Sequence, residues 1–396
     1  MTSAHGLVHG TLSQNVFYHC YETGHNKTGL FLKAISAFKA IDYREIHPGE
    51  ILVDEWYLEE TCEAGKLEHF FDGYTAELRR KLPANYGATA INRHSLVWGS
   101  WNDGNHRNIN SEQLLKTAQY LKATFPTVKW IQIDDGYSNE ACRLNIAHGL
   151  GMPYEGKDGI DYSRFPQGMK VFFDAVRRIG LRPAIWIGGF CPKATRIYRE
   201  NPEWFCNYDH RVTASAPLDI SQPEVWKYML DALDMLLMEF GCEGMKHDFW
   251  SYVFEESTPL FANHCYSGYE YRRNWLVEIR KRLSSDGYLQ TGCDIVMGNP
   301  FLGEYFTNYR YGIDIGSGNW DCVKTSFLWG SACFATHTGD LFVPNSDSVG
   351  LFPGLTDDEA LFCINYCLVT GSMVEIAGNL DLHVGEPRME ILQKAV

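Results

Sequence analysis

The sequence predicts a (β/α)8 TIM barrel preceded by the tail of a β-sandwich domain, and three observations support this fold class. From residue 95 onward, short runs rich in β-branched and aromatic residues alternate with segments of helical periodicity, and about eight such strands can be counted. Residues 1–60 instead alternate polar and apolar side chains, which is typical of antiparallel strands. Acidic residues recur where the later strands end, and those ends form the active face of a barrel.

We expect three parts in the chain of 396 residues: a remnant of an N-terminal β-sandwich domain at 1–60, a connecting helix and linker at 61–90, and the catalytic barrel at 91–396. In the first part, residues 16–20 and 29–32 are predicted strands. Two further segments, 43–47 and 51–58, flank the turn Pro48-Gly49-Glu50. Residues 63–82 have helical periodicity with mixed charges, and we interpret them as the connecting helix.

The barrel elements follow from periodicity and from the signals at their ends. A long polar and glycine-rich loop at 137–165 is expected to cover a site, because loops of that length inside a compact domain are usually functional. Thr356 and Glu359 have the spacing of a capping box at the start of a helix. The predicted strands are 95–98, 128–133, 183–190, 245–249, 288–293, 309–315, 341–344 and 373–377. The predicted helices are 111–124, 169–179, 193–200, 223–240, 269–283, 321–336 and 356–370.

Composition and charge exclude several function classes. Hydrophobic residues make up 45% of the chain, which allows a sizeable core, and the aromatic share of 14% suits stacking on sugars as well as packing. The formal net charge is −14 without any basic run, which argues against nucleic acid and favours a neutral substrate. No run of about 18 apolar residues occurs, so no membrane span is expected. The first residues lack the pattern of a signal peptide, which predicts a cytoplasmic protein.

The cysteines and other reactive residues give no sign of a cofactor. The 12 cysteines contain no C-x-x-C pair, which favours reduced, buried thiols over a disulfide framework. We find no cluster of metal ligands with site-like spacing, no phosphate-binding glycine loop and no serine nucleophile elbow. The sequence therefore predicts neither a metal nor another cofactor.

The segment 244–250, Gly-Met-Lys-His-Asp-Phe-Trp, is the most informative stretch of the chain. It follows a helical run and a turn, as a parallel strand would. Lys246 and Asp248 are two residues apart, so in a strand they project from the same face. The ammonium group would then hold the carboxylate ionised and oriented. His247 points the other way and is interpreted as a packing residue.

Further carboxylates follow other predicted strands. Asp134 and Asp135 end the second strand, and Asp314 lies four residues after Arg310. In a barrel all of these side chains reach one rim, where two carboxylates facing a glycosidic bond can divide the chemistry. One attacks the anomeric carbon, and the other protonates the leaving oxygen and then activates water. The adjacent Asp134 and Asp135 could accept hydrogen bonds from neighbouring sugar hydroxyls.

The order of these motifs resembles the α-galactosidase family known as glycoside hydrolase family 36, over about residues 48–380. Trp98-Gly-Ser-Trp101 is similar to the first-strand W-x-S-W of the family, and Ile133-Asp-Asp-Gly136 to its second-strand I-D-D-G. Residues 184–187 resemble its third strand, and residues 218–223 resemble its L-D-L-(T/S)-x-P segment. Lys246-His-Asp-Phe249 matches K-x-D-F, and residues 310–314 match R-x-x-x-D. Each motif alone is weak, but together in one order they are specific.

The resemblance implies roles for individual residues. Asp248 corresponds to the nucleophile and Asp314 to the acid/base. Lys246 and Arg310 correspond to groups that bind and orient the substrate. Three further side chains are candidates for the sugar pocket: the aromatic rings of Trp101 and Trp186, for which packing in the barrel core is the alternative, and Cys293, which ends a predicted strand and could instead be a buried thiol.

The sequence also departs from the family pattern. The preceding β domain is represented only by its tail and a following β domain is missing, so an incomplete chain is expected. Trp250 is a bulky residue for the rim, and residues 345–347 look like a variant of N-D-P-D without the proline. Asp294 stands where a small residue is expected. These departures concern the identity of the substrate more than the type of reaction.

The predicted function is a retaining glycoside hydrolase that cleaves terminal α-galactosyl or closely related α-glycosyl residues by double displacement. The partner is an oligosaccharide or glycoconjugate, with no nucleic acid or membrane, and homo-oligomers are possible. An α-galactosyl transglycosylase and a non-catalytic sugar-binding barrel remain alternatives. A metal-dependent lyase or isomerase is another, with Lys246 as base and the carboxylates as Mg²⁺ ligands.

Overall fold

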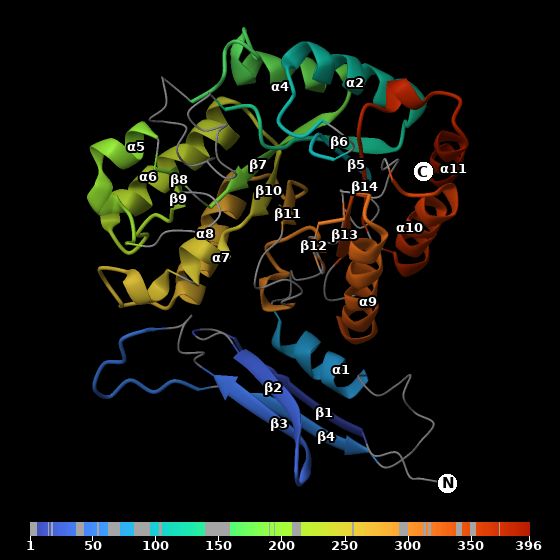
Figure 1. Ribbon diagram of the computed structural model, residues 1–396. Coiled ribbons are helices and arrows are strands. Elements are labelled where there is room, and N and C mark those ends of the chain that lie inside the picture. The colour runs from blue at the N-terminus through green and yellow to red at the C-terminus, as the bar shows by residue number, and fades with distance from the viewer. Residues whose placement is uncertain are drawn as a thin grey trace, which may run out of the picture.

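Eight parallel strands form the centre of the computed structural model, and helices surround them (Figure 1). The sheet order is β11-β10-β7-β6-β5-β14-β13-β12, so neighbours in space follow one another along the chain. A parallel bridge between Gln290 and Asn308 joins β11 to β12 and closes the ring. The predicted (β/α)8 barrel is therefore confirmed. The structure describes residues 6–14, 16, 19–36, 43–53, 55–61, 72–82, 96–102, 105–138, 159–189, 191–193, 195–207, 215–255, 257–292, 300–310, 312, 314–315, 318–337, 343–348, 354–371 and 373–396.

The barrel strands lie close to their predicted positions. Four differ from expectation by two or more residues: the third and the fifth end two residues earlier than predicted, the sixth is assigned only over its first two residues, and the seventh begins where the predicted strand ended. Their bounds are β5 Leu96–Gly99, β6 Val128–Ile133, β7 Arg182–Gly188, β10 Gly244–Asp248, β11 Tyr288–Thr291, β12 Tyr309–Arg310, β13 Pro344–Ser348 and β14 Met373–Ala377. A two-stranded ribbon of β8 Cys191–Pro192 and β9 Ser215–Ala216 lies outside the barrel sheet.

Three of the described helices begin at residues whose side chains satisfy free backbone N–H groups. The Asn110 side chain accepts a hydrogen bond from the backbone N–H of Gln113 at 3.0 Å, and both Ser267 and Thr356 open helices with complete capping boxes. The helices are α1 Asp72–Lys81, α2 Ser111–Thr124, α4 Gly168–Ile179, α5 Arg196–Glu200, α6 Pro223–Leu233, α7 Ser251–Phe254, α8 Gly268–Arg282, α9 Trp320–His337, α10 Asp357–Thr370 and α11 Pro387–Ala395. The predicted helix 223–240 changes to a π-helical turn at Asp234–Glu239, and the helix expected at 63–82 is described only from Asp72.

The N-terminal part consists of two antiparallel strand pairs below the barrel (Figure 1). β1 Gly6–Thr11 pairs with β4 Trp56–Thr61, and β2 His19–Asn26 pairs with β3 Gly29–Ser36. The turn at Gly49 is present, but its flanking segments 43–47 and 51–53 are not strands, and the chain becomes extended only at Trp56. Arg44 contacts Glu270 of α8 at 2.9 Å, which ties this part to the barrel.

Alternation along the barrel strands sorts the inward side chains into layers. The lowest layer is an apolar cluster of Val97, Trp130, Ala184, Tyr288, Val343 and Met373. Two residues further along the strands, the inward side chains are polar and buried: Gln132, Lys246, Gln290, Asn345 and Glu375. Branched apolar side chains dominate most barrel interiors. In this barrel the polar layer instead forms a charged floor below the carboxyl ends of the strands.

No helix within the described part of the chain combines the length and the apolar character needed to cross a bilayer.

Candidate active site

Lys246 and Asp248 of β10 point into the barrel from the same face, as predicted, and both are buried. Lys246 Nζ donates a hydrogen bond to Asp134 Oδ2 at 3.0 Å. Asp248 Oδ2 instead accepts a hydrogen bond from the indole Nε1 of Trp186 at 3.0 Å. Lys246 therefore does not orient Asp248 through a direct hydrogen bond, because its ammonium group reaches the carboxylate that follows β6, on the far side of β7 in the sheet. Its charge still favours the ionised form of Asp248.

Asp134 and Asp135 follow β6 and take different partners. The backbone N–H of Asp134 donates to the Ser100 hydroxyl at 2.9 Å, and its carboxylate accepts both Lys246 and the backbone N–H of Asp135. The Asp135 carboxylate accepts a hydrogen bond from Arg107 Nε at 2.6 Å. Arg107 also lies 6.0 Å from the centre of the Trp101 ring. The two carboxylates are thus held apart by two different cations.

Arg310 links two carboxylates on the opposite wall. Its side chain is fully buried, and its Nη2 donates to Asp314 Oδ1 at 2.8 Å while its Nη1 lies 3.2 Å from Asp347 Oδ1. Asp347 also accepts the backbone N–H of Ile315 at 2.8 Å and has a positive φ of 79°. A non-glycine residue in this region is strained, and such strain persists where surrounding contacts enforce it. The Arg310–Asp314 pairing predicted from the spacing is present.

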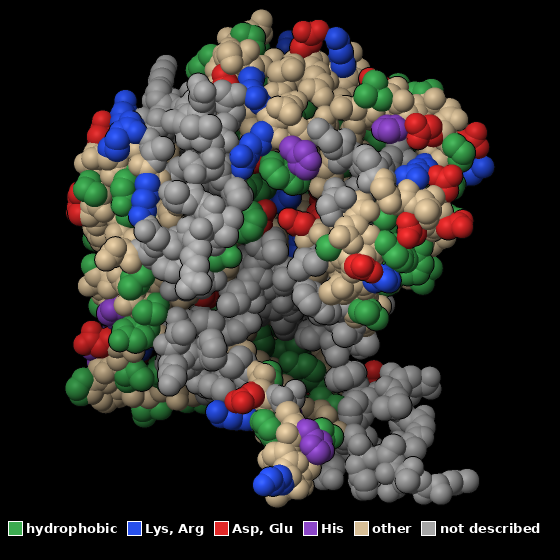
Figure 2. Space-filling model, viewed as in Figure 1, with side chains coloured by type: hydrophobic (Ala, Val, Ile, Leu, Met, Phe, Trp, Pro, Cys, Tyr) green, Lys and Arg blue, Asp and Glu red, His purple; other side chains and the backbone are tan. Residues whose placement is uncertain are grey.

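A cavity of about 280 Å³ brings these residues together at the carboxyl ends of the strands. In the view of Figure 2, acidic side chains are visible in a hollow at the centre of the barrel. The residues that line the cavity are Trp101, Arg107, Asp134, Asp135, Trp186, Lys246, Asp248, Phe249, Asp314 and Asp347. Aromatic rings and paired charges on one concave surface suit a polar, uncharged ligand with apolar faces.

The carboxylates differ in their affinity for protons. Burial raises the pKa of Asp248 to about 7, against the opposing influence of Lys246. Burial likewise raises the pKa of Asp135 to about 7, although Arg107 acts to lower it. Asp314 is 61% exposed at its side chain. Desolvation acts to raise the pKa of Asp314, but the charges of Arg310 and Lys246 outweigh it and hold that pKa below its usual value.

The backbone around Asp248 leaves little freedom to its carboxylate. A Cβ atom at Gly292 would lie 2.0 Å from Asp248 Oδ1, so only glycine allows this approach. Phe249 has a positive φ of 59° and turns the chain directly after the strand. As a result, Trp250 is fully buried behind the site and donates to the Ile187 carbonyl at 3.3 Å. The expectation that Trp250 stands at the rim is therefore wrong.

Comparison with known proteins identifies the family. The family model described as Melibiase matches residues 71–282, which is more than half of the chain. The chain belongs to the Melibiase family. Membership makes it a glycoside hydrolase, the class that the sequence predicts. A search of curated proteins gives no match.

Solved structures with the same fold cover nearly the whole chain. An α-galactosidase from Thermus thermophilus, in complex with stachyose, has a TM-score of 0.67 and 17% identity over 99% of this chain and 77% of its own. The family 36 α-galactosidase AgaA from Geobacillus stearothermophilus has a TM-score of 0.69 and 13% identity over 99% of this chain and 53% of its own. The chain thus spans about half the length of the Geobacillus enzyme. At these identities the likeness establishes the fold.

Most of the predicted site residues of this Melibiase family member meet at the cavity. Trp101, Trp186, Asp134, Asp135, Lys246, Asp248 and Asp314 line it directly. Arg310 lies behind Asp314. Cys293, Asp294 and most of the loop 137–165 lie outside the described residues. His247 is buried and accepts a hydrogen bond from Trp275 Nε1 at 3.0 Å, away from the cavity, in agreement with a packing role.

Sequence reasoning missed three lining residues. Arg107 and Phe249 carry no signal of their own, because a loop arginine and a residue after a strand are common in any barrel. Asp347 belongs to the segment that was compared with N-D-P-D, but without a structure its contact with Arg310 cannot be inferred. Among the described residues, no group of three or more His, Cys, Asp or Glu side chains is arranged to hold a metal ion.

Proposed function

We propose that this chain is a retaining glycosidase that removes terminal α-galactosyl, or closely related α-glycosyl, residues by double displacement. The observation that carries the proposal is the cavity that is lined by Asp248, at the end of β10, and by Asp314, in the segment after β12, together with Lys246 and Asp134. The solved relatives whose names mention stachyose and raffinose support an oligosaccharide as the substrate.

In the first step, an oxygen of Asp248 attacks the anomeric carbon. The bond from that carbon to the aglycone oxygen breaks, and the leaving oxygen takes a proton from Asp314. In the second step, Asp314 removes a proton from water as the water oxygen attacks the same carbon. The bond between the sugar and Asp248 then breaks, which releases the sugar and restores both carboxyl groups.

The remaining residues bind and orient the sugar. Lys246 and Asp134 form a buried donor–acceptor pair for sugar hydroxyls, and Asp135 with Arg107 forms a second. The Trp186 N–H stabilises the ionised form of Asp248 and restricts its orientation. Trp101 offers an aromatic ring at the cavity wall.

The proton distribution of the site must change when substrate binds. The pKa of Asp314 is held low by Arg310, whereas the proposed first step requires Asp314 to carry a proton. A sugar that fills the cavity removes water from Asp314 and competes for the N–H groups of Arg310. Both effects raise the pKa of Asp314 and prepare it to act as the acid.

The test is hydrolysis of an aryl α-galactoside by the wild type and by Asp248→Ala and Asp314→Ala. We expect azide to rescue Asp248→Ala with a β-galactosyl azide product, because azide then attacks the substrate directly. Azide should rescue Asp314→Ala with an α-galactosyl azide, because it attacks the glycosyl-enzyme. Exchanged products would reverse the two roles, and a folded wild type without any turnover would favour a non-catalytic barrel. Products formed with added acceptor sugar separate hydrolysis from transglycosylation.

A further inference from the structure

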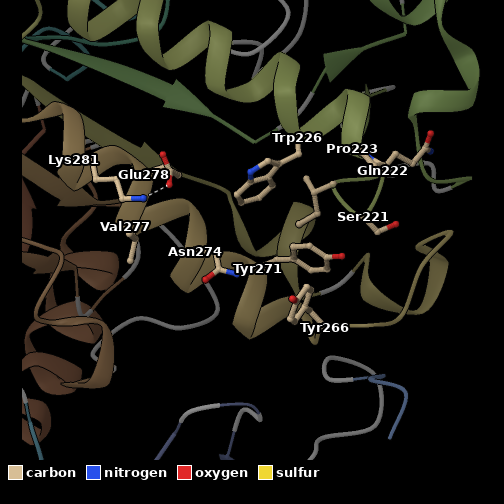
Figure 3. A pocket seen from close by; sticks show the side chains of 11 residues that line it. Ser221, Gln222, Pro223, Trp226, Tyr266, Tyr271, Asn274, Val277, Glu278 and Lys281 are labelled. Carbon is tan, nitrogen blue, oxygen red and sulfur yellow. Dashed lines mark hydrogen bonds and ion pairs between the residues drawn. The ribbon is translucent and has the colours of Figure 1, made fainter. Parts of the chain in front are cut away.

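A second cavity, of about 430 Å³, lies outside the barrel between α6 and α8 (Figure 3). We call it the α6–α8 groove, and it is larger than the cavity at the strand ends. It shares none of its lining residues with the proposed active site. These residues are Ile220, Ser221, Gln222, Pro223, Trp226, Tyr266, Tyr271, Asn274, Val277, Glu278 and Lys281.

Three aromatic rings shape the groove. Figure 3 shows Trp226 extending from α6 toward Tyr271 and Tyr266. The Tyr266 and Tyr271 rings meet edge to face at 5.5 Å, and the Trp226 ring lies 6.1 Å from that of Tyr271. Tyr271 is buried, whereas Tyr266 is 47% exposed. The groove therefore presents ring surface that is rigidly backed on one side and open to solvent on the other.

The polar atoms of the groove fall into two groups. The outer ones already have partners: Ser221 Oγ donates to Asp219, and Glu278 accepts a hydrogen bond from Lys281 at 2.6 Å. By contrast, within the described part of the chain we find no hydrogen-bond partner for the Trp226 indole N–H, the Tyr266 and Tyr271 hydroxyls or the Asn274 amide. These groups are also not sealed from solvent.

This combination fits one class of ligand. Sugars offer apolar C–H faces that pack on aromatic rings, and hydroxyls that pair with indole, phenol and amide groups. The charges of Glu278 and Lys281 neutralise each other, so the groove favours an uncharged ligand. Burial raises the pKa of Tyr271 to about 12, so its hydroxyl keeps its proton throughout the neutral range.

We propose that the α6–α8 groove is a second carbohydrate-binding site, which holds a neutral oligosaccharide outside the barrel. The choice of ligand rests on the proposed function. The rim of the groove is joined to the segment that follows the strand of Asp248, because the Ser221 hydroxyl accepts the backbone N–H of Asn263 at 3.1 Å. A sugar chain held there would raise the local concentration of substrate near the barrel.

The experiment follows the indole N–H resonance of Trp226 in the Asp248→Asn chain, which blocks turnover, while raffinose is added. Trp226→Phe assigns the resonance. We expect it to shift saturably and calorimetry to detect two raffinose sites per chain. Tyr266→Ala should weaken the groove site at least tenfold and leave hydrolysis of a small aryl α-galactoside unchanged. Phe362→Ala is the matched control, because Phe362 is also 47% exposed, on α10. Tyr266→Phe, which removes only the hydroxyl, should show a smaller loss in the same direction.

Several outcomes would overturn the proposal. One is an unchanged Trp226 resonance at raffinose concentrations that saturate the barrel. Another is an equal effect of Tyr266→Ala and Phe362→Ala, and a third is a groove that binds a proline-rich peptide but not the sugar. If the chain hydrolyses the aryl substrate but raffinose does not bind in the groove, only the groove inference fails. If the groove binds raffinose but no glycoside is hydrolysed, only the catalytic proposal fails.

Discussion

Replacing the buried Glu375 with glutamine should stabilise the protein at alkaline pH and much less at acid pH. Glu375 projects from β14 into the polar layer of the barrel and is 1% exposed. Its Oε2 accepts a hydrogen bond from Gln290 Nε2 at 3.0 Å, and its other oxygen lies against Gly99, where a Cβ atom would come within 2.5 Å. Burial raises its pKa to about 7 despite the attraction of Lys246.

The magnitude follows from the difference in pKa between the folded and unfolded chains. The ordinary pKa of a glutamate is 4.5, so the folded state raises it by about 2.5 units. Each pKa unit corresponds to about 1.4 kcal/mol, so the burial of this carboxylate costs on the order of 3 to 4 kcal/mol. Below pH 4.5 both states are protonated and Glu375 costs nothing. Between 4.5 and 7 the unfolded chain loses its proton first, so the free energy of unfolding falls as pH rises. Above 7 the full cost remains.

Glu375→Gln removes this titration while keeping the shape and a hydrogen-bonding amide opposite Gln290. The gain in the free energy of unfolding over the wild type should therefore grow between pH 5 and pH 8 by about 2–3 kcal/mol. Urea unfolding at four pH values measures it, with Glu390→Gln as an exposed control that removes the same charge. A gain that does not change with pH, or a variant that is less stable at pH 8, would refute the reasoning. The first result would mean that the attraction of Lys246 offsets the burial of the Glu375 carboxylate, and the second would mean that it exceeds the cost of burial.

Three further predictions concern the site. The first step needs Asp248 ionised and Asp314 protonated, although the pKa of Asp248 is about 7 and that of Asp314 is held below its usual value. The reactive form of the free enzyme is therefore a minor protonation state, so kcat/KM should fall on the alkaline side with an apparent pKa of about 7, and a profile that stays level through pH 8 would contradict the burial argument. Trp186→Phe removes the N–H that lowers the pKa of Asp248, so the alkaline limb of kcat/KM should move to higher pH, and an unchanged or lowered apparent pKa would count against the hydrogen bond. Gly292→Ala places a methyl group 2.0 Å from Asp248 Oδ1, which should reduce kcat/KM by about 10²-fold. Full activity in that folded variant would show that the carboxylate is free to move.

The position of the elements along the chain was accessible from the sequence because it depends on local signals. The alternation of apolar strands with capped helices predicted the barrel, and α2, β6 and β14 match the predicted ranges. Local reasoning failed where the signal was not periodic. Residues 43–47 and 51–53 alternate like strands, but nothing in the described chain pairs with them as strands. Likewise Trp250 follows a strand, yet the positive φ of Phe249 turns it into the core.

The chemical character of the site was also visible in the sequence, because Lys246, Asp248, Arg310 and Asp314 have spacings that place each pair on one strand face or turn. What each carboxylate contacts depended on the tertiary structure. Lys246 pairs with Asp134 rather than with Asp248, because side chains from β10 and from the end of β6, two strands that are not adjacent in the sheet, meet inside the ring. The burial of Glu375 in the polar layer and the close approach of Gly292 to the Asp248 carboxylate likewise depend on contacts between different strands. The sequence determines which groups face inward, whereas closure of the barrel decides which of them meet and how strongly burial shifts their charges.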